Sequence, residues 1–501
     1  MRSLFAALGV CGMVIAPGCA PLTPLTLPPE TASVPATTGL WSELSGVRPG
    51  DWFTLLNSGE EALDWRLRCM DSASRSLDLQ TFLWKADPTG LRILRHLYDA
   101  ADRGVRVRLL LDDTFTAMEE PEIVAIDRHP NIDVRIYNPF SRRFSNLALR
   151  QLMNLGEFYR LDHRMHNKTL IVDNQAAIIG GRNLADEYFG NHPSANFRDM
   201  EVLCAGPLVQ VISGRFDDYW NCGWSFPADQ LIRRPPSEDI APDRLPERSE
   251  GRGFQESLKD RHAAWRMAAA SAASGKASLI YDEPAGEDPG AETEQPNQLA
   301  ERLLRLLEQV DTELIIVTAY LVPTPAIEKA IERAEDKGVQ VRILTNSLRS
   351  NNHLVAHSAY RSHIRRLIGH GADLHEVRAQ AKDRRLYMQA PVEGKELGLH
   401  AKLLVIDDSH VFIGSANLDP RSLRLNTEIG VLIESRGFNS RVRETLAVDF
   451  HLRNAWRLET RDDGRIIWVA DDTVLDAQPA DSAFQRLEDW FFGMLPIEGE
   501  M

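Results

Sequence analysis

Two segments of this chain carry the same spacing of polar residues, and the separation between them is constant. His166 and His400 lie 234 residues apart, and so do Lys168 and Lys402. The same separation relates three further pairs, which are Asp173 and Asp407, Gly180 and Gly414, and Asn183 and Asn417. One H-x-K-x4-D match is a weak signal, but two copies in one register are hard to obtain by chance. The sequence therefore predicts an internal duplication, which restricts the fold to two equivalent halves.

Each His-x-Lys pair stands at the head of an apolar run, as in 402–406. Side chains two apart on a strand share a face, so the imidazole and the ammonium project together from a strand whose other residues are core. A buried lysine is costly without a counter-charge, and stability alone gives no reason to place one beside a histidine twice. We therefore interpret His166, Lys168, His400 and Lys402 as catalytic residues.

The duplication extends over whole domains. A strand pattern, a helical pattern ended by glycine and a buried-strand pattern occur in this order twice, at 77–83, 88–103 and 105–111, and at 313–321, 325–337 and 339–344. Strands that alternate with helices are typical of a largely parallel sheet. We predict an α/β fold of two tandem domains, with mixed, mainly parallel sheets flanked by helices and the active site at a pseudo-twofold interface.

A chain of 501 residues with 43% hydrophobic content can bury two sizeable cores. We expect the first domain at 46–226 and the second at 298–501. Residues 227–297 are rich in Pro and charge and are interpreted as a linker or insertion, with a helix near 257–273 and a short strand at 279–281. A C-terminal helix carries the aromatic stripe Phe484, Leu487, Trp490, Phe491 and Leu495, for which packing on the second domain is favoured over membrane contact.

The N-terminus reads as an export signal. Residues 1–19 have one Arg, an apolar run too short to span a membrane, and then Cys19. The sequence Ala16-Pro-Gly-Cys19 resembles a bacterial lipoprotein cleavage box, which predicts lipidation of Cys19, although an uncleaved anchor is the alternative. Residues 20–45 would then be a tether. This arrangement predicts a membrane-associated protein of the bacterial cell envelope that faces the periplasm.

The motif residues supply what displacement at phosphorus needs, namely a nucleophile, a proton donor and fixed positive charge. One imidazole attacks a phosphodiester and the other protonates the departing alcohol. Lys168 and Lys402 hold phosphate oxygens as point charges, and Asn183 and Asn417 donate amide hydrogens to them. This chemistry requires no metal and no cofactor.

Each imidazole needs a partner that fixes its tautomer. Glu428 lies 28 residues after His400 in a strand-like segment, and Glu201 holds the corresponding place in the first half. Asp199 lies two residues before Glu201 on the same face, so the choice between these two stays open. Asp173 and Asp407 complete the catalytic motif, but their position at strand ends favours a role in fixing turns.

These residues match the signature of the phospholipase D superfamily, and the resemblance covers about residues 50–497. The strings HNKTLIVDNQAAIIGGRN and LHAKLLVIDDSHVFIGSANLDPRSLRLNTEIGV resemble bacterial cardiolipin synthases of the C type. The resemblance implies transfer of a phosphatidyl group onto phosphatidylglycerol through a phosphohistidine. By analogy with superfamily members, His166 is the nucleophile and His400 the general acid and base. The implied partners are anionic phospholipids at a membrane surface, with phosphatidylglycerol or phosphatidylethanolamine as the donor.

A hydrolase of the same fold remains an alternative, either a phospholipase D or, less favoured, an envelope nuclease. The formal net charge of −15 disfavours nucleic acid as a partner, because nucleic-acid binders usually carry a basic footprint. Two local stretches are basic, 142–164 with a net charge of +3 and 349–385 with +5. They are interpreted either as contacts for lipid headgroups at the mouth of the site or as solvated helix faces.

Overall fold

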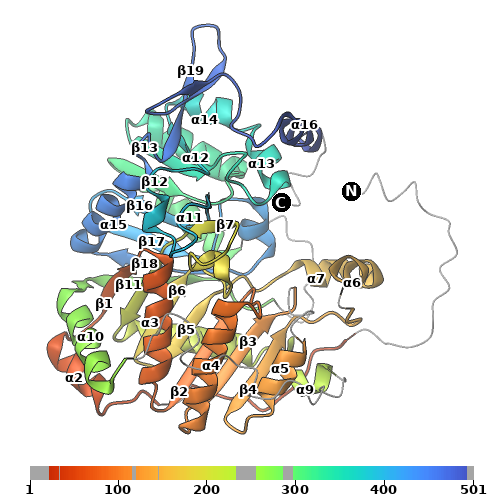
Figure 1. Cartoon of the computed structure of the whole chain (residues 1–501), viewed down its shortest axis with the longest axis vertical. Coiled ribbons are helices and arrows are strands. Elements are labelled where there is room, and N and C mark those ends of the chain that lie inside the picture. The colour runs from red at the N-terminus through yellow and green to blue at the C-terminus, as the bar shows by residue number, and fades with distance from the viewer. Residues whose placement is uncertain are drawn as a thin grey trace, which may run out of the picture.

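The computed structural model describes residues 22–32, 34–114, 120–144, 146–232, 256–285 and 297–493. The two halves are stacked on each other, with the first coloured red to yellow and the second green to blue (Figure 1). In the described residues, each half is built on one large sheet and a two-stranded sheet joins the halves. In spatial order the first sheet contains β10 (Ala273–Ser274), β1 (Trp52–Leu56), β8 (Glu201–Ala205), β6 (Ala176–Gly180), β5 (Thr169–Val172), β2 (Ser76–Thr81), β3 (Arg106–Asp112), β4 (Ile132–Tyr137) and β9 (Ser225–Pro227).

The second sheet repeats the strand order of the first. Its strands are β11 (Lys276–Tyr281), β18 (Ile429–Glu434), β17 (His410–Gly414), β16 (Leu403–Ile406), β12 (Glu313–Val317), β13 (Gln340–Asn346), β14 (Asp373–Val377), β19 (Ala455–Thr460), β20 (Ile466–Val469) and β21 (Val474–Leu475). The run β1-β8-β6-β5-β2-β3-β4-β9 therefore corresponds to β11-β18-β17-β16-β12-β13-β14-β19. The predicted duplication of an α/β domain is confirmed.

The prediction of mainly parallel sheets is wrong. Strands β2, β3 and β4 pair in parallel, as do β12, β13 and β14, but every other named pairing within these two sheets is antiparallel. The reason is local, because each motif strand turns back directly into the next strand, as β5 into β6 and β16 into β17. A short reversal of this kind makes an antiparallel hairpin, whereas a parallel pair needs a crossover connection.

The same sequence signals form the crossover helices of the two halves. Helix α4 (Pro88–Asp102) begins where the side chain of Asp87 accepts from the N–H of Gly90, and Thr324 caps α12 (Pro325–Asp336) in the same way. Each helix has proline in its first turn and is followed by a glycine with positive φ, Gly104 at +87° and Gly338 at +84°. These ends set the path of the chain into the next strand.

Three hydrophobic clusters account for the layers. The outer helices of the first half are α2 (Leu40–Val47), α3 (Gly59–Ser72), α4, α5 (Glu120–Asp127), α9 (Ala228–Leu231) and α10 (Leu258–Ser271). The outer helices of the second half are α11 (Gln298–Glu308), α12, α13 (Leu354–Tyr360) and α14 (Ile364–His370). The third cluster lies between the sheets and contains residues of both halves, including those of α8 (Leu208–Trp220) and α15 (Arg436–Asp449). One continuous core therefore joins the halves and fixes their relative position.

Two segments interpreted as connections are part of the body. Residues 22–32 and 34–38 of the expected tether run along the first half, where the N–H of Leu22 donates to Ser141 Oγ (3.2 Å) and that of Ala36 to the carbonyl of Asp173 (3.1 Å). Within the expected linker, α10 and β11 form as predicted, but Trp265 of α10 is fully buried and β11 is an edge strand of the second sheet. No helix in the described ranges is long and apolar enough to cross a membrane.

The C-terminal helix is present as α16 (Ala483–Phe492), but the prediction that its aromatic stripe packs on the second domain is wrong. The side chains of Phe484, Leu487, Trp490 and Phe491 are 50–65% exposed, and Leu495 lies outside the described residues. The residue that α16 buries is a carboxylate, Asp489. The remaining projecting elements are α6 (Leu147–Met153), η2 (Leu155–Glu157) and α7 (Phe158–Asp162), on the same side of the molecule as α16 (Figure 1).

Candidate active site

The site lies where the main chains of the two halves pair with each other. Strand β7 (Ala195–Arg198) of the first half runs parallel to β15 (Glu396–Leu399) of the second, and the N–H of His400 donates to the carbonyl of Arg198 (2.8 Å). A matching bridge joins Met165 to Thr427, and the N–H of His166 donates to the carbonyl of Thr427 (2.9 Å). Each motif histidine is therefore held by backbone from the opposite half.

This pairing gives each imidazole a carboxylate from the opposite half. His166 Nδ1 lies 2.9 Å from both carboxylate oxygens of Glu428. His400 Nδ1 lies 2.7 Å from Asp199 Oδ2. In both cases Nε2 is the ring nitrogen left for chemistry, since a carboxylate that accepts from Nδ1–H fixes that tautomer.

Strand register resolves the choice between Asp199 and Glu201. Gly180 pairs with Glu201, whereas in the second half Gly414 pairs with Gly430. Glu201 therefore corresponds to Gly430, and the residues two positions earlier are Asp199 and Glu428. Between the paired asparagine and this carboxylate, the first half contains five more residues than the second, which breaks the constant separation and obscures the match in sequence.

The interpretation of Glu201 as an imidazole partner is wrong. Its carboxylate is fully buried and accepts from Arg66 at 2.6 and 2.7 Å and from Arg182 at 3.2 Å. Arg182 also donates to the carbonyl of Asp199. Glu201 therefore neutralises two buried guanidinium groups behind the site, and one of them supports the backbone of the carboxylate that contacts His400.

Both motif lysines are buried beside their histidines. Lys168 Nζ donates to the carbonyl oxygen of His166 (2.6 Å), and Lys402 Nζ donates to that of His400. Burial lowers the pKa of Lys168 to about 7, with Lys402 adding to the effect and Glu428 opposing it. Burial likewise lowers the pKa of Lys402 to about 8 against the charges of Asp199 and Glu428. The charge of Lys402 therefore acts directly on Lys168.

The same environment keeps both imidazoles neutral. Burial and the charge of Lys402 lower the pKa of His400 to about 3, although Asp199 opposes the shift. Burial also lowers the pKa of His166, against the influence of Glu428 and with that of Lys168. Although burial works against ionisation of Glu428, His166 and Lys168 hold its pKa below the ordinary value. The resting site thus combines neutral histidines with ionised carboxylates, and its two lysines are cationic only below their lowered pKa values.

These pKa values predict how anion affinity depends on pH. A lysine binds a phosphate oxygen only while protonated, so affinity is greatest below pH 7 and is lost as Lys168 and then Lys402 deprotonate. Calorimetry with glycerophosphoglycerol, a soluble phosphodiester that stays a monoanion over this range, should show affinity about tenfold weaker at about pH 9 than at about pH 6. The control is Lys329→Met, which removes an exposed lysine of α12 and should leave the profile unchanged. A flat profile in the unmodified protein would contradict the assignment.

Asp173 and Asp407 belong to the catalytic motif, and their contacts agree with the role in fixing turns that their position favours. The carboxylate of Asp173 accepts from the backbone N–H groups of 74–76, and Asp407 accepts from those of 311–313. Both residues have positive φ, +51° and +49°, as asparagine and aspartate tolerate in turns. Each therefore ties the turn after a motif strand to the start of the neighbouring strand.

The spacing shared by the two motifs also places two amide side chains at the site, and aromatic side chains lie beside them. Asn183 Oδ1 accepts from the N–H of Leu83 (3.2 Å), and both Asn183 and Asn417 are buried. Sequence reasoning did not identify the aromatic residues. The ring centroids of Phe82 and His166 are 4.9 Å apart. Those of Tyr188 and Phe197 lie 5.0 and 5.4 Å from the ring centroid of His400. Residues this close to a neutral imidazole restrict its rotation and exclude water from it.

The two half-sites differ behind their carboxylates. Ser415 Oγ donates to Glu428, and the equivalent position in the first half is Gly181. A Cβ on Gly181 would lie 2.9 Å from both oxygens of Asp199. The shorter acid therefore requires a glycine, while the longer one has a hydroxyl donor in the same place.

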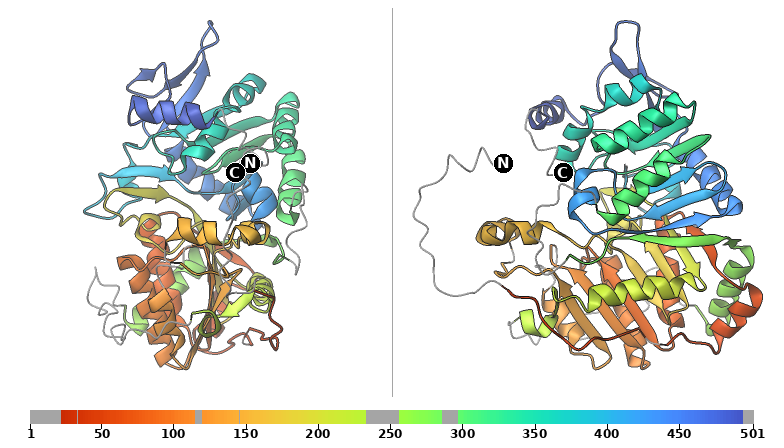
Figure 2. Two further views of the ribbon diagram at one scale, coloured as in Figure 1. Left: turned by 90° about the vertical axis from the view of Figure 1, so that its right-hand side faces the viewer. Right: turned by 180° about the vertical axis from the view of Figure 1, so that it is seen from behind.

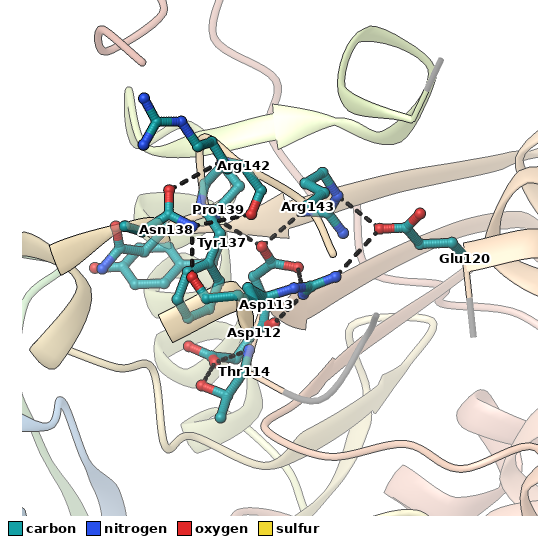
Figure 3. A network of polar contacts seen from close by, with 12 residues as sticks. Asp112, Asp113, Thr114, Glu120, Tyr137, Asn138, Pro139, Arg142 and Arg143 are labelled. Carbon is teal, nitrogen blue, oxygen red and sulfur yellow. Dashed lines mark hydrogen bonds and ion pairs between the residues drawn. The ribbon is translucent and has the colours of Figure 1, made fainter. Parts of the chain in front are cut away.

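Many cations of the two basic stretches are paired with acids of the protein. In the first, Arg150, Arg160 and Arg164 are buried, and Arg143 lies 2.6 Å from Asp113 and 2.8 Å from Glu120 (Figure 3). In the second, several cations pair with protein carboxylates, namely Arg349 with Glu396, Arg366 with Glu328, and Arg378 and Lys382 with Asp471 and Asp472. The interpretation of 142–164 as a headgroup-binding patch is therefore wrong for four of its five arginines, because all except Arg142 pair with carboxylates of the protein.

In the described ranges, no group of three or more His, Cys, Asp or Glu side chains is arranged to hold a metal ion. Cys19 lies outside the described residues. What remains is a duplicated α/β fold in which two His-x-Lys half-sites, each completed by the other half, meet at one seam. This combination defines an enzyme of the phospholipase D-like class.

Comparison with known proteins gives the family. The model for "Cardiolipin synthase, PLD-like domain" matches residues 67–220 and 303–449, and the chain belongs to this family. It is 33% identical to cardiolipin synthase C of Escherichia coli (strain K12) over 461 residues, which covers 88% of this chain and 94% of the relative. It is 25% identical to cardiolipin synthase B of Shigella flexneri, with 80% of each chain covered.

Among solved structures, the phosphatidylserine synthase of Haemophilus influenzae Rd KW20 has the same fold. It superposes with a TM-score of 0.56 at 15% identity and covers 84% of this chain and 92% of its own. The resemblance inferred from the two motifs is thereby confirmed. The chain is an enzyme of the phospholipase D superfamily and is cardiolipin synthase-like.

Proposed function

We propose that this enzyme moves a phosphatidyl group onto the headgroup of phosphatidylglycerol and so makes cardiolipin. The proposal rests on two imidazole–carboxylate contacts, each of which joins a histidine of one half to an acid of the other half. They are His166 with Glu428 and His400 with Asp199. It provides two oriented histidines and two lysines for one phosphodiester, which is the set that a two-step displacement through a covalent intermediate uses.

In the first step Nε2 of His166 attacks the phosphorus of the donor lipid. The bond from phosphorus to the headgroup oxygen breaks, and that oxygen takes a proton from Nε2 of His400. Glu428 stabilises the positive charge that develops on the attacking ring, because it accepts from Nδ1–H. Lys168 and Lys402 hold the charged phosphoryl oxygens, with Asn183 and Asn417 as amide donors to the same oxygens. The products are a phosphatidyl-histidine and a free headgroup alcohol.

In the second step the headgroup hydroxyl of phosphatidylglycerol gives its proton to Nε2 of His400. The oxygen attacks phosphorus, the bond from phosphorus to nitrogen breaks, and its electron pair returns to His166. With phosphatidylglycerol as donor the alcohol released is glycerol, and with phosphatidylethanolamine it is ethanolamine. The assignment of attack to His166 rests on the resemblance to other members of the superfamily.

Substrate binding itself prepares His400 to act as an acid. In the resting protein its pKa is about 3, since burial and the nearby Lys402 disfavour the imidazolium. A phosphodiester anion seated between the lysines offsets their charge and raises the pKa of His400. Protonation of the general acid is therefore coupled to occupation of the site.

Two observations support transfer rather than hydrolysis. The alignment with E. coli cardiolipin synthase C extends over 94% of that protein, which includes both halves. The side chains of His166 and His400 are 11% and 7% exposed, and Glu428 and Asp199 are fully buried. A site so poorly open to solvent favours a lipid hydroxyl over water as the acceptor.

The location of the enzyme follows from its N-terminus. We infer that residues 1–19 direct export and that lipidation of Cys19 anchors the protein in the bacterial envelope, facing the periplasm. Leu22, three residues after Cys19, contacts the folded body, because its N–H donates to Ser141 Oγ.

The deciding experiment incubates the purified enzyme with phosphatidylglycerol, with and without phosphatidylethanolamine, and identifies the products by mass. We expect cardiolipin, accompanied by glycerol from the first mixture and by some ethanolamine if both lipids serve as donors. Phosphatidic acid without cardiolipin would overturn the proposal in favour of a phospholipase D. The control is His400→Ala, which should give neither product.

A further inference from the structure

Two surface segments expose most of the large apolar side chains of the described chain. The first is α6, η2 and α7 with their connections, which we call the α6–α7 arm, and the second is α16. Sixteen large hydrophobic side chains are exposed in the described residues, and nine belong to these segments. The nine are Leu149, Leu152, Leu155, Phe158, Tyr159, Phe484, Leu487, Trp490 and Phe491, with exposed fractions from 39 to 65%.

The two segments are oriented with apolar side chains outward and charged side chains inward. In the arm, Arg150 and Arg160 are buried, and Arg150 lies 3.4 Å from Glu120 in the same carboxylate cluster that holds Arg143 (Figure 3). In α16 the buried residue is Asp489, whose carboxylate lies 2.9 Å from His357 Nδ1 and accepts from Ser358 Oγ at 2.9 Å. A water-facing helix normally shows the opposite polarity. Solvent alone therefore does not explain these segments.

The arm and α16 lie on one side of the molecule although they come from different halves. Both project to the right in Figure 1, both face the viewer in the left view of Figure 2, and both lie at the left in its right view. Three views therefore agree on the placement. The two segments could contact one flat surface together.

Both segments are rooted beside the seam that forms the active site. Asp162 ends α7 and pairs with Arg421, which belongs to the segment leading to Glu428 in the second half. His166 follows Asp162 by four residues. Helix α16 packs on α13, which begins at His353. Burial lowers the pKa of His353, and the nearby charge of Arg421 lowers it further. A surface covered by both segments would thus lie next to the seam that holds the paired histidines.

The outer face of these segments carries little charge, so it does not repel an anionic partner. Among the described residues of α6, η2, α7 and α16, Arg486 is the exposed charged side chain, while Glu157, Asp162 and Glu488 are half-buried. This contrasts with the whole chain, in which 72 acidic residues outnumber 57 basic ones. Leu22, the first described residue, bonds to Ser141 just before α6. A lipid on Cys19 would be separated from Leu22 by about 10 Å of extended chain at most.

We propose that the α6–α7 arm and α16 form one docking surface for an anionic phospholipid bilayer. Their aromatic and aliphatic side chains insert at the level of the headgroups, and the active-site seam between them faces the membrane. This inference rests on the proposed function, because it names the surface by which that site reaches its lipid substrate.

The test measures co-flotation with vesicles of phosphatidylethanolamine and phosphatidylglycerol. All proteins are the full chain with Cys19→Ser, which removes the anchor. The arm variant is Leu152→Ser with Phe158→Ser, and the helix variant is Leu487→Ser with Trp490→Ser. The matched control is Leu258→Ser with Met267→Ser, which removes two exposed apolar side chains of α10 on the far side of the molecule (65 and 70% exposed). We expect partitioning onto vesicles to be about tenfold weaker for each surface variant. The control should partition as strongly as the parent protein.

Turnover of dihexanoyl phosphatidylglycerol, a soluble lipid, separates docking from catalysis. Both surface variants should retain wild-type turnover on it below its micelle concentration and should keep the same melting temperature. Unchanged flotation, or an equal loss in the α10 control, would overturn the docking proposal. The proposal would also be overturned if light scattering without vesicles showed that the surface variants differ from the parent protein in oligomeric state. The surface would then be an interface between protein chains. If the parent protein binds vesicles through this surface but makes no cardiolipin, the proposed function is wrong and the docking proposal is supported.

Discussion

Replacing His400 by alanine should abolish turnover of phosphatidylglycerol and yet leave a protein that can still be phosphorylated. We expect a loss of about ten-thousand-fold for both His400→Ala and His166→Ala, because each removes a group that acts in both half-reactions. The two variants differ with a phosphodiester that has a nitrophenol leaving group, which departs without a proton donor. His400→Ala should then release one nitrophenol per enzyme and accumulate a phosphohistidine, while His166→Ala should do neither.

Mass spectrometry of the trapped peptide decides the assignment of roles. A phosphoryl group on His166 in the His400→Ala variant supports the proposed order of events. The reverse pattern, with phosphorylation of His400 in His166→Ala, would exchange the roles. His410→Ala is a suitable control, because this half-buried histidine lies on β17 next to the motif and should leave activity unchanged. Near-normal turnover by either motif variant would refute the two-histidine mechanism.

The second large effect concerns the carboxylates, and it should cross between the halves. Asp199→Asn removes the acceptor of His400 Nδ1, and Glu428→Gln removes that of His166. Loss of the orienting carboxylate allows the wrong tautomer, so we expect turnover to fall by about a hundredfold to ten-thousand-fold. With the nitrophenyl substrate, Asp199→Asn should accumulate phosphohistidine as His400→Ala does. Glu428→Gln should form none.

Glu201→Gln provides the comparison that distinguishes orientation from stability. Glu201 is as buried as Asp199, but it neutralises Arg66 and Arg182. Removing its charge leaves two guanidinium groups underpaired, for which the cost in folding free energy is about 3–5 kcal/mol. The melting temperature should therefore drop, while the folded fraction shows no trapped phosphohistidine. If Glu201→Gln trapped the intermediate and Asp199→Asn did not, the register argument would be wrong.

The sequence was sufficient for the duplication, for the four motif residues and for Glu428, because a constant separation survives wherever no residues are inserted. It was not sufficient for Asp199, since the five additional residues after Asn183 shift every later match. Strand pairing restores the correspondence, because Gly180 and Gly414 occupy equivalent positions in the two sheets and their partners across the strand pair can be compared directly. The exchange of carboxylates between the halves is a tertiary feature, and no local pattern encodes it.

Two other errors have a common physical origin. The aromatic stripe of α16 was expected to pack on the second domain, and the arginines of 142–164 were weighed as headgroup contacts, because apolar residues usually lie inside and charged ones outside. Here a cluster of carboxylates draws the arginines inward, and the buried Asp489 turns the apolar face of α16 outward. Periodicity identifies the faces of a helix, but the partner of each face depends on distant residues.

The exchange of acids across the seam also bears on how such an enzyme arose. A chain consisting of one half would possess an imidazole, a cation and an acid, but that acid lies in position to hold only the imidazole of another half, so its site would be complete only in a symmetric pair of copies. An origin as a fused pair of copies would account for this exchange. In a single chain the two acids no longer have to be identical, and here one is short with a glycine behind it, Asp199 and Gly181, while the other is longer with a hydroxyl, Glu428 and Ser415.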